Sequence, residues 1–130
     1  MKTELLYLVA SAALTGLLWV PYILDRIAKW GLVPAVSYPE NPPVQSDWAR
    51  RLMRAHANNV ENLVVFGVLV LAAQDAGVSN GATALAAAAY FWGRVVHLIA
   101  YTFAIPWVRT VGFSIGFLAQ ATFAWQLLVR

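Results

Sequence analysis

The sequence predicts an all-α integral membrane protein, a bundle of four transmembrane helices. Of its 130 residues, 61% are apolar and only 12% are charged, whereas a soluble domain carries about 25% charged residues. Long apolar segments recur between short polar or proline-rich stretches, and a helix needs about 20 residues to cross the hydrocarbon core. The length leaves room for four such helices in a single domain over residues 1–130.

The first helix is expected over about residues 4–28. Residues 5–24 carry no charge, and this run is longer than the apolar region of a signal peptide, about 7–15 residues. We therefore expect a retained membrane span. Pro21 lies inside it and lacks a backbone N–H group, which predicts a kink.

The first connection, residues 30–47, contains four of the six prolines and is expected to be an ordered or extended loop. Ser46 or Asp47 is the expected N-cap of the second helix, because either side chain offers an oxygen to the free amides of a first turn. The second helix is predicted over about residues 48–74.

The third helix is predicted over about residues 82–104 and the fourth over about residues 108–129. The short connection between the second and third helices makes them antiparallel neighbours. An alanine-rich run at residues 84–89 and the G-x-x-x-G spacing of Gly112 and Gly116 favour close helix packing in lipid. Pro106 ends the third helix.

The basic residues predict the orientation of the bundle. They gather at the first and third connections, whereas the second connection has none. By the positive-inside rule, those two connections face the cytoplasm and both termini lie outside. The residues concerned are Arg26, Lys29, Arg50, Arg51 and Arg109, with Lys2 and Arg130 at the termini.

Charged side chains within the second helix indicate a polar site inside the membrane. The uncharged segment at residues 62–74 is too short to span, so part of the preceding stretch RRLMRAHANNVE must lie within the bilayer. At helical spacing Arg51, Arg54, Asn58 and Glu61 share one face. That face is unsuited to lipid and is expected to face protein or water.

The third helix carries a matching face at Arg94, His97 and Tyr101, and Arg109 opens the fourth helix at the same membrane side. The topology therefore gathers these residues with those of the second helix in one half of the bundle. A structural interpretation is a buried ion pair of Glu61 with Arg54 or Arg94, which would fix the helix register. The excess of four arginines over one glutamate instead favours a site for an anionic ligand.

Other kinds of site are not predicted. The two histidines are 41 residues apart and the chain has no cysteine, which makes a poor ligand set for a metal. The nine basic residues are scattered among the membrane segments, which does not indicate nucleic-acid binding. A small multidrug-type transporter would need a membrane carboxylate that can take up protons. Glu61 is the one candidate, and the neighbouring arginines would keep it ionised.

Two sequence blocks resemble the MAPEG family, the membrane-associated proteins in eicosanoid and glutathione metabolism, including microsomal glutathione transferases and microsomal prostaglandin E synthase. One is R-x-x-R-A-H-x-N-x-x-E at residues 51–61, and the other is G-R-V-V-H-L-I-A-Y at residues 93–101, followed by I-P-W-V-R-T at residues 105–110. The resemblance extends over the whole chain in length, number of spans and spacing of the blocks.

The resemblance implies a homotrimer that binds glutathione between neighbouring subunits near the cytoplasmic face, with no metal. It implies a glutathione transferase or peroxidase that acts on hydrophobic small molecules from the membrane lipid. Arg109 matches the arginine that stabilises the thiolate, with Tyr101 beside it. The implied glutathione-binding residues are Arg26, Arg51, Arg54, Asn58, Glu61, Arg94, His97 and Thr110.

Two positions depart from the family pattern. Ala57 stands where several family enzymes have a basic residue for a glutathione carboxylate, and Val65 stands where a proline is usual. The first departure leaves room for another anionic thiol. It also leaves open an alternative function as a non-catalytic lipid-binding protein of the same family.

Overall fold

The computed structural model describes residues 1–129, so Arg130 lies outside the described residues. All regular secondary structure in that range is helical. Four stretches are long and apolar enough to cross a membrane, namely Thr3–Trp30, Asp47–Asp75, Gly81–Thr102 and Val108–Leu128. They agree with the predicted four-helix membrane bundle. The helices are α1 (Thr3–Leu17), α2 (Trp19–Trp30), α3 (Leu32–Ala35), α4 (Asp47–Asp75), α5 (Gly81–Thr102) and α6 (Val108–Leu128).

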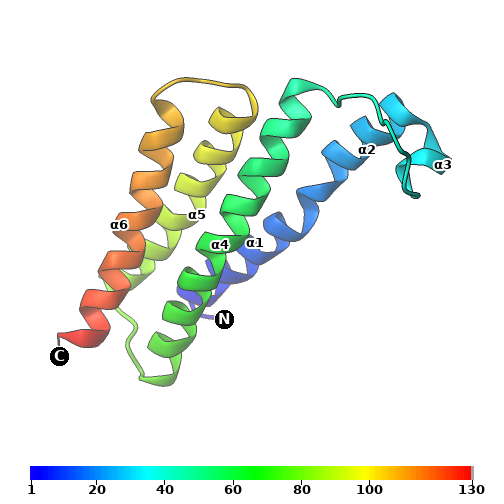
Figure 1. Cartoon of the computed structure of the whole chain (residues 1–130). Coiled ribbons are helices and arrows are strands. Elements are labelled where there is room, and N and C mark those ends of the chain that lie inside the picture. The colour runs from blue at the N-terminus through cyan, green and yellow to red at the C-terminus, as the bar shows by residue number, and fades with distance from the viewer. Residues whose placement is uncertain (130) are drawn as a thin grey trace.

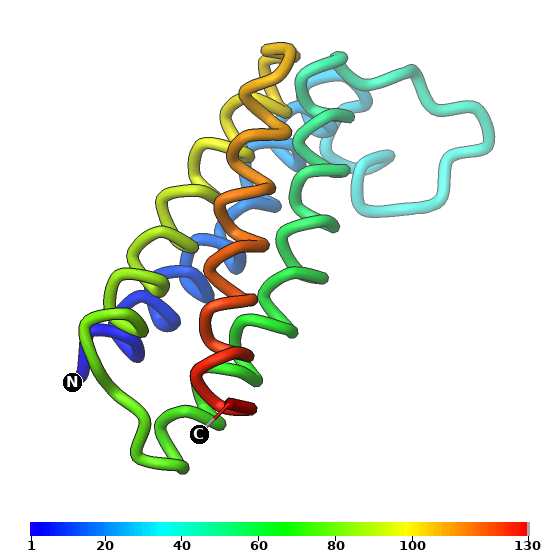
Figure 2. Tube along the Cα trace, turned by 90° about the vertical axis from the view of Figure 1, so that its left-hand side faces the viewer, coloured from blue at the N-terminus to red at the C-terminus, as the bar shows by residue number. Residues whose placement is uncertain are grey.

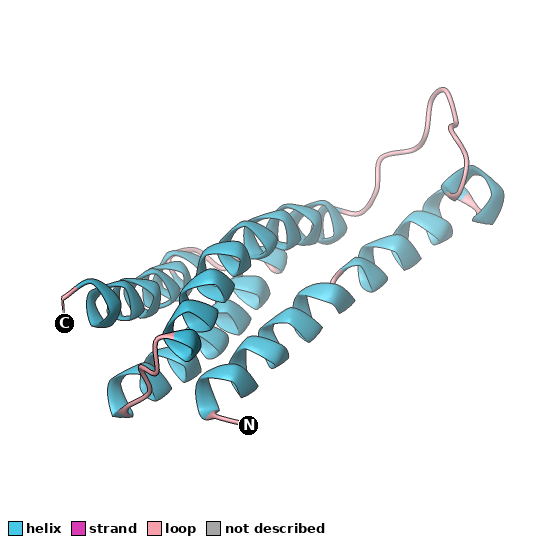
Figure 3. Ribbon diagram, turned by 90° about the horizontal axis from the view of Figure 1, so that it is seen from below, coloured by secondary structure: helices cyan, strands magenta, loops and turns pink. Residues whose placement is uncertain are grey.

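The first span is divided into α1 and α2 at Leu18, three residues before Pro21, so the helix is interrupted near the predicted kink. Pro21 has no N–H group to donate to the carbonyl of Leu17, four residues earlier. The N–H group of Leu18 turns back to the carbonyl of Thr15 at 3.4 Å. Before the break, α1 packs on α4 and α5. After the break, α2 continues along α4 (Figure 3).

The spans run alongside one another, so the bundle has two distinct ends (Figure 1). Both termini and the α4–α5 connection lie at one end, which we call the terminal end. The connections at residues 31–46 and 103–107 lie at the other, which we call the site end. α5 and α6 lie side by side along their whole length, and α4 packs against both (Figure 2).

The α5–α6 contact depends on glycine. A Cβ atom on Gly112 would lie 2.7 Å from the carbonyl oxygen of Gly93 and 2.7 Å from the backbone nitrogen of His97. A Cβ atom on Gly116 would meet the Arg94 side chain at 3.3 Å. The G-x-x-x-G pair therefore lets the two backbones approach as closely as they do.

The core of the terminal end is aromatic. The ring of Phe66 stacks on Tyr90 with ring centroids 3.7 Å apart, and Phe123 meets Phe66 edge-on at 5.9 Å. All three side chains are buried. Small residues of α5, including Ala86 and Ala87, complete this core and allow the helices to pack closely.

Two local predictions need correction. Ser46 occupies the N-cap position of α4, but neither it nor Asp47, which is the first helical residue, makes a capping bond. The Ser46 hydroxyl instead donates to the carboxylate of Asp25 at 2.5 Å, because a charged acceptor competes successfully with the helix amides. The third predicted helix ends at Thr102 rather than residue 104, since Ala104 adopts a left-handed φ of 56°.

Candidate functional site

Arg94 is the centre of a polar network inside the bundle, with only 2% of its surface exposed. Its Nε atom donates to Asn59 Oδ1 at 2.9 Å, and its Nη2 atom donates to Asn58 Oδ1 at 2.6 Å. Asn59 Nδ2 in turn donates to the hydroxyl of Thr15 at 2.6 Å. The guanidinium of α5 is thus tied to α4 and, through α4, to α1.

The same network reaches the fourth span. The amide of Asn62 donates to Asn58 Oδ1 at 3.3 Å, and Gln120 of α6 donates to the carbonyl oxygen of Asn62 at 3.2 Å. Side chains from all four spans therefore take part in one hydrogen-bonded system. Neutral amides supply the acceptors for the buried charge of Arg94.

The structural ion pair considered for Glu61 is wrong for the single chain. Glu61 is exposed, and among the described residues the one ion pair joins Arg50 to Asp47. Asn59 bonds Arg94, and two further residues along a helix turn a side chain through about 200°. Glu61 is therefore turned away from Asn59 and lies exposed on the surface of α4, beside half-buried Asn58.

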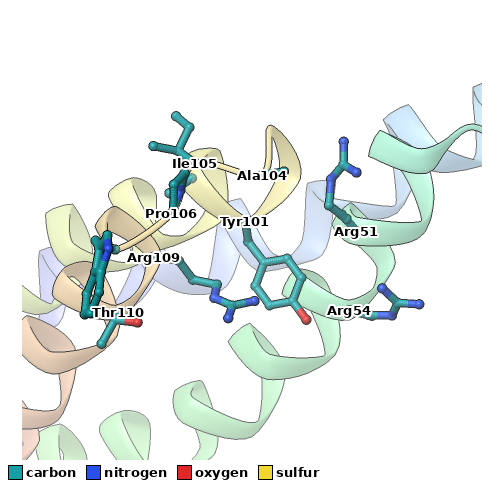
Figure 4. A pocket seen from close by; sticks show the side chains of 10 residues that line it. Arg51, Arg54, Tyr101, Ala104, Ile105, Pro106, Arg109 and Thr110 are labelled. Carbon is teal, nitrogen blue, oxygen red and sulfur yellow. The ribbon is translucent and has the colours of Figure 1, made fainter.

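Two adjoining cavities lie at the site end, with volumes of about 300 Å³ and 310 Å³. Both are lined by Tyr101, Arg109 and Thr110, which therefore stand between them. Arg51 and Arg54 of α4 add two more guanidinium groups to the first cavity, across from Arg109 (Figure 4). Asn58, His97 and Phe113 line the second.

Arg109 is held by an aromatic neighbour. Its guanidinium carbon lies 4.7 Å from the centroid of the Tyr101 ring, a cation–π contact between the start of α6 and the end of α5. Arg51 is also held in place, because its Nε atom donates to the carbonyl oxygen of Thr102 at 2.8 Å. Positive charge at the cavity is thus fixed by contacts within the chain.

The backbone before Arg109 is strained. Trp107 has φ 68° and ψ −41°, and the N–H group of Val108 donates to the carbonyl of Pro106 at 2.8 Å, which makes a γ-turn of the rare positive-φ type. Ala104 is also left-handed. Such conformations persist where the surrounding structure enforces them and are often found at functional sites. Here the turn sets where α6 begins, and Arg109 is its second residue.

His97 presents a buried imidazole to the second cavity. Only 3% of its surface is exposed, and its buried Nδ1 atom has no hydrogen-bond partner among the described residues. The ring lies 5.6 Å from Tyr101 and 6.3 Å from Phe113, measured between centroids. Buried polar atoms without partners are uncommon in folded proteins, which makes His97 a candidate for a functional role.

The family assignment follows from a comparison of the whole sequence. The model of the MAPEG family matches residues 5–129. The chain belongs to the MAPEG family. Comparison with curated proteins and with solved structures finds no match.

The single MAPEG chain brings together seven of the ten predicted site residues as cavity walls. These are Arg51, Arg54, Asn58, His97, Tyr101, Arg109 and Thr110. Arg94 lies behind the walls and reaches the second cavity through Asn58. Among the described residues, no group of three His, Asp or Glu side chains lies close enough together to hold a metal ion.

Two predicted residues lie away from both cavities of the MAPEG chain. The Arg26 guanidinium lies at the end of α2, donates to Gln45 Oε1 at 3.1 Å and rests 5.2 Å from the Trp30 ring. Glu61 is exposed on the surface of α4. Neither side chain lines a cavity within one chain.

Sequence reasoning missed two residues of this site. Asn59 is buried and donates and accepts within the Arg94 network, and Phe113 lines the second cavity. The spacing of apolar positions along α4 contains a signal for Asn59, because it shares a face with Leu52, Ala55 and Phe66, all of them buried. Phe113 follows Arg109 by four residues, one helical turn.

Proposed function

We propose that this MAPEG protein is a membrane-bound glutathione-dependent transferase or peroxidase acting on lipophilic electrophiles or hydroperoxides. The observation that carries the proposal is Arg109, which stands at the junction of both cavities against the ring of Tyr101. Many members of the family are glutathione-dependent enzymes. The same arginine occupies the position of the thiolate-stabilising residue in the family pattern.

The donor set of the cavities suits most of a glutathione molecule. The tripeptide carries two carboxylates and a thiol, and Arg51, Arg54 and Arg109 offer guanidinium groups along the two cavities. Guanidinium groups bind carboxylates through paired hydrogen bonds. The amide of Asn58, which lines the second cavity with His97, offers a polar contact for the peptide groups.

The chemistry expected of Arg109 is electrostatic. Glutathione supplies a thiol with an ordinary pKa of about 8.5, and the thiolate is the nucleophile. A fixed guanidinium beside the sulfur favours the anion and raises its population at neutral pH. Tyr101 holds Arg109 in place. Thr110, the residue after Arg109, lines the same cavity and carries a hydroxyl that can donate to the sulfur.

The ammonium group of glutathione needs an acid, and neither cavity is lined by one. Glu61 is exposed on the single chain, Arg26 is half-buried at the end of α2, and family members are typically trimeric. We propose that a homotrimer brings Glu61 of one subunit to the ammonium group, and Arg26 to a carboxylate, of a glutathione bound in the cavities of the next. On this arrangement the complete glutathione site lies between subunits at the site end, which the basic residues assign to the cytoplasmic face.

A lipophilic substrate would reach the sulfur from the membrane. Exposed apolar side chains flank the cavities, including Ile105, Trp107 and Phe113. Membrane lipid is therefore continuous with the mouth of the site, and a hydrophobic molecule can approach without crossing water. The guanidinium groups of the cavities and the apolar surroundings together favour thiol chemistry on membrane-dissolved compounds.

The test is a titration of the detergent-purified protein with glutathione, followed through the ultraviolet absorbance of the thiolate. We expect saturable binding and thiolate absorbance at neutral pH, together with turnover of an activated chlorobenzene or an organic hydroperoxide. Binding without turnover of any electrophile or hydroperoxide would favour the non-catalytic lipid-binding alternative. Absence of both binding and turnover would refute the glutathione proposal.

A further inference from the structure

Residues 31–46 form a connection with an unusually apolar exposed surface, which we call the interface loop. Figures 1 and 2 show it extending from the site end, clear of the four spans. Its short helix α3 packs against α2. Val33 is 73% exposed and Val36 is 75% exposed. The other large apolar side chains open on this loop are Leu32, Tyr38 and Val44.

The base of the loop is fixed by hydrogen bonds. Asp25 accepts from the backbone N–H group of Ser46 at 3.0 Å and from the amide of Gln45 at 3.2 Å. The indole N–H group of Trp30 donates to the carbonyl oxygen of Pro43 at 2.6 Å. The apolar tip is therefore presented in a defined place and does not fold back on the bundle.

The backbone of the loop is suited to a poorly hydrated environment. Buried N–H groups without partners are unfavourable, and Pro34, Pro39, Pro42 and Pro43 have none. In α3 the N–H groups of Ala35 and Val36 donate to the carbonyls of Gly31 and Leu32 at 3.1 and 3.2 Å. Desolvation of residues 34–37 therefore leaves no N–H group unpaired, since Ser37 also donates to the carbonyl of Pro34 at 3.3 Å.

The position of the loop relative to the bilayer follows from the first span. Thr3–Trp30 contains 28 residues, which at 1.5 Å per residue gives about 42 Å. A bilayer measures about 40–45 Å including its headgroups, so the span ends at Trp30 within the headgroup region. Trp and Tyr side chains are enriched at this depth.

The charges around the loop match an anionic lipid surface. Between residues 30 and 46 the one charged side chain is Glu40. Arg26 and Lys29 precede the loop, beside Asp25, and Arg50 and Arg51 follow it, after Asp47. An apolar tip between basic flanks is the pattern of segments that lie in the plane of a membrane interface.

We propose that the interface loop inserts its apolar tip into the headgroup–acyl boundary of the leaflet at the site end and binds lipid there. Its apolar surface continues the lipid-facing surface of the spans, which makes the same bilayer its nearest partner. The exposed Lys29 at the end of α2 then contacts lipid phosphates. The inference is independent of glutathione and of any activity.

The absence of cysteine allows a direct test of depth. Val33→Cys and Val36→Cys, each labelled with an environment-sensitive fluorophore, report on the apolar tip, and Glu40→Cys is the control on the same loop. The proteins are reconstituted into vesicles of phosphatidylcholine and phosphatidylglycerol. Quenching by nitroxide lipids labelled near the headgroup is compared with quenching by aqueous iodide.

We expect the labels at positions 33 and 36 to be quenched by the nitroxide lipid several-fold more strongly than the label at position 40, with the reverse order for iodide. Equal access of iodide to all three labels would refute the proposal in favour of a solvated loop. Protection of positions 33 and 36 from both quenchers would refute it in favour of cover by a second copy. Each variant is first checked for an unchanged melting temperature.

Discussion

The two ends of the bundle place similar helices in opposite environments. At the terminal end α1 packs against α4 and α5 beside the stacked rings of Phe66 and Tyr90. At the site end α2 has left α5, and the space between the ends of α4, α5 and α6 is occupied by two cavities lined by arginine. The break before Pro21 therefore separates a region built for packing from a region open to ligand.

Two arginines show what this difference means for a side chain. Arg94 is enclosed by the packed region, with its hydrogen bonds directed at Asn58 and Asn59. Arg109 rests on Tyr101 at the open region and faces both cavities. We expect loss of Arg94 to affect mainly stability and loss of Arg109 to affect mainly chemistry.

The largest expected effect is on turnover in Arg109→Ala. Removal of a preorganised charge beside the sulfur should lower kcat by about 10²–10³, while glutathione affinity stays within a few-fold because other guanidinium groups hold the carboxylates. The measurement is kcat and KM toward an activated chlorobenzene, together with thiolate absorbance. Arg50→Ala, which removes an exposed arginine outside both cavities, is the matched control. Full turnover in Arg109→Ala would reduce this residue to a topological anchor.

The second effect is on stability in Arg94→Leu. The side-chain oxygen of Asn59 would lose its donor inside the bundle, at about 1–3 kcal/mol for an unpaired group, and that of Asn58 would keep only the longer bond from Asn62. Unfolding in a denaturing detergent measures the change. Arg50→Leu should stay within about 0.5 kcal/mol, as surface substitutions usually do. An unchanged stability of Arg94→Leu would show that the network contributes nothing.

The third effect tests the contact between α5 and α6. Gly112→Ala places a methyl group against the backbone of Gly93 and His97, so the helices must separate, at about 1–3 kcal/mol. Gly16→Ala is the control, because a Cβ atom there meets nothing within 4 Å, and alanine should stabilise α1 by up to about 1 kcal/mol. Equal melting temperatures for the two variants would contradict the close contact.

The smallest effect is expected for Glu61→Gln. Since Glu61 makes no ion pair with any residue of the described range 1–129, the subunit should not lose stability. Glutathione affinity should weaken a few-fold, corresponding to about 1 kcal/mol or less for a screened charge pair. Isothermal titration measures the affinity, with Asp75→Asn at the far end of α4 as the control. Unchanged affinity would remove Glu61 from the site.

The sequence was sufficient for the spans and for much of the cavity lining. Apolar length predicted the ends of α4 and α6 to within one residue, because the bilayer sets a minimum length for each span. Helical periodicity grouped His97 with Tyr101, and both line the second cavity. Antiparallel topology then predicted that Arg109 would lie near them.

Other features depended on contacts that periodicity does not contain. Two residues along a helix change the direction of a side chain by about 200°, and this separates the buried Asn59 from the exposed Glu61. The pairing of Ser46 with Asp25 joins two segments across the first connection. A hydrogen bond between distant segments leaves no local pattern, so the expected cap could not be distinguished from it.

The buried guanidinium of Arg94 also has a consequence for the synthesis of the protein. An arginine at the middle of a span opposes insertion by about 2.5–3.5 kcal/mol, and α5 carries Arg94 as its one Lys, Arg, Asp or Glu residue. Its acceptors belong to α4, which leaves the ribosome first. We therefore expect α4 to be in the bilayer before α5 enters. The asparagines of α4 are then available to accept hydrogen bonds from Arg94 as α5 inserts.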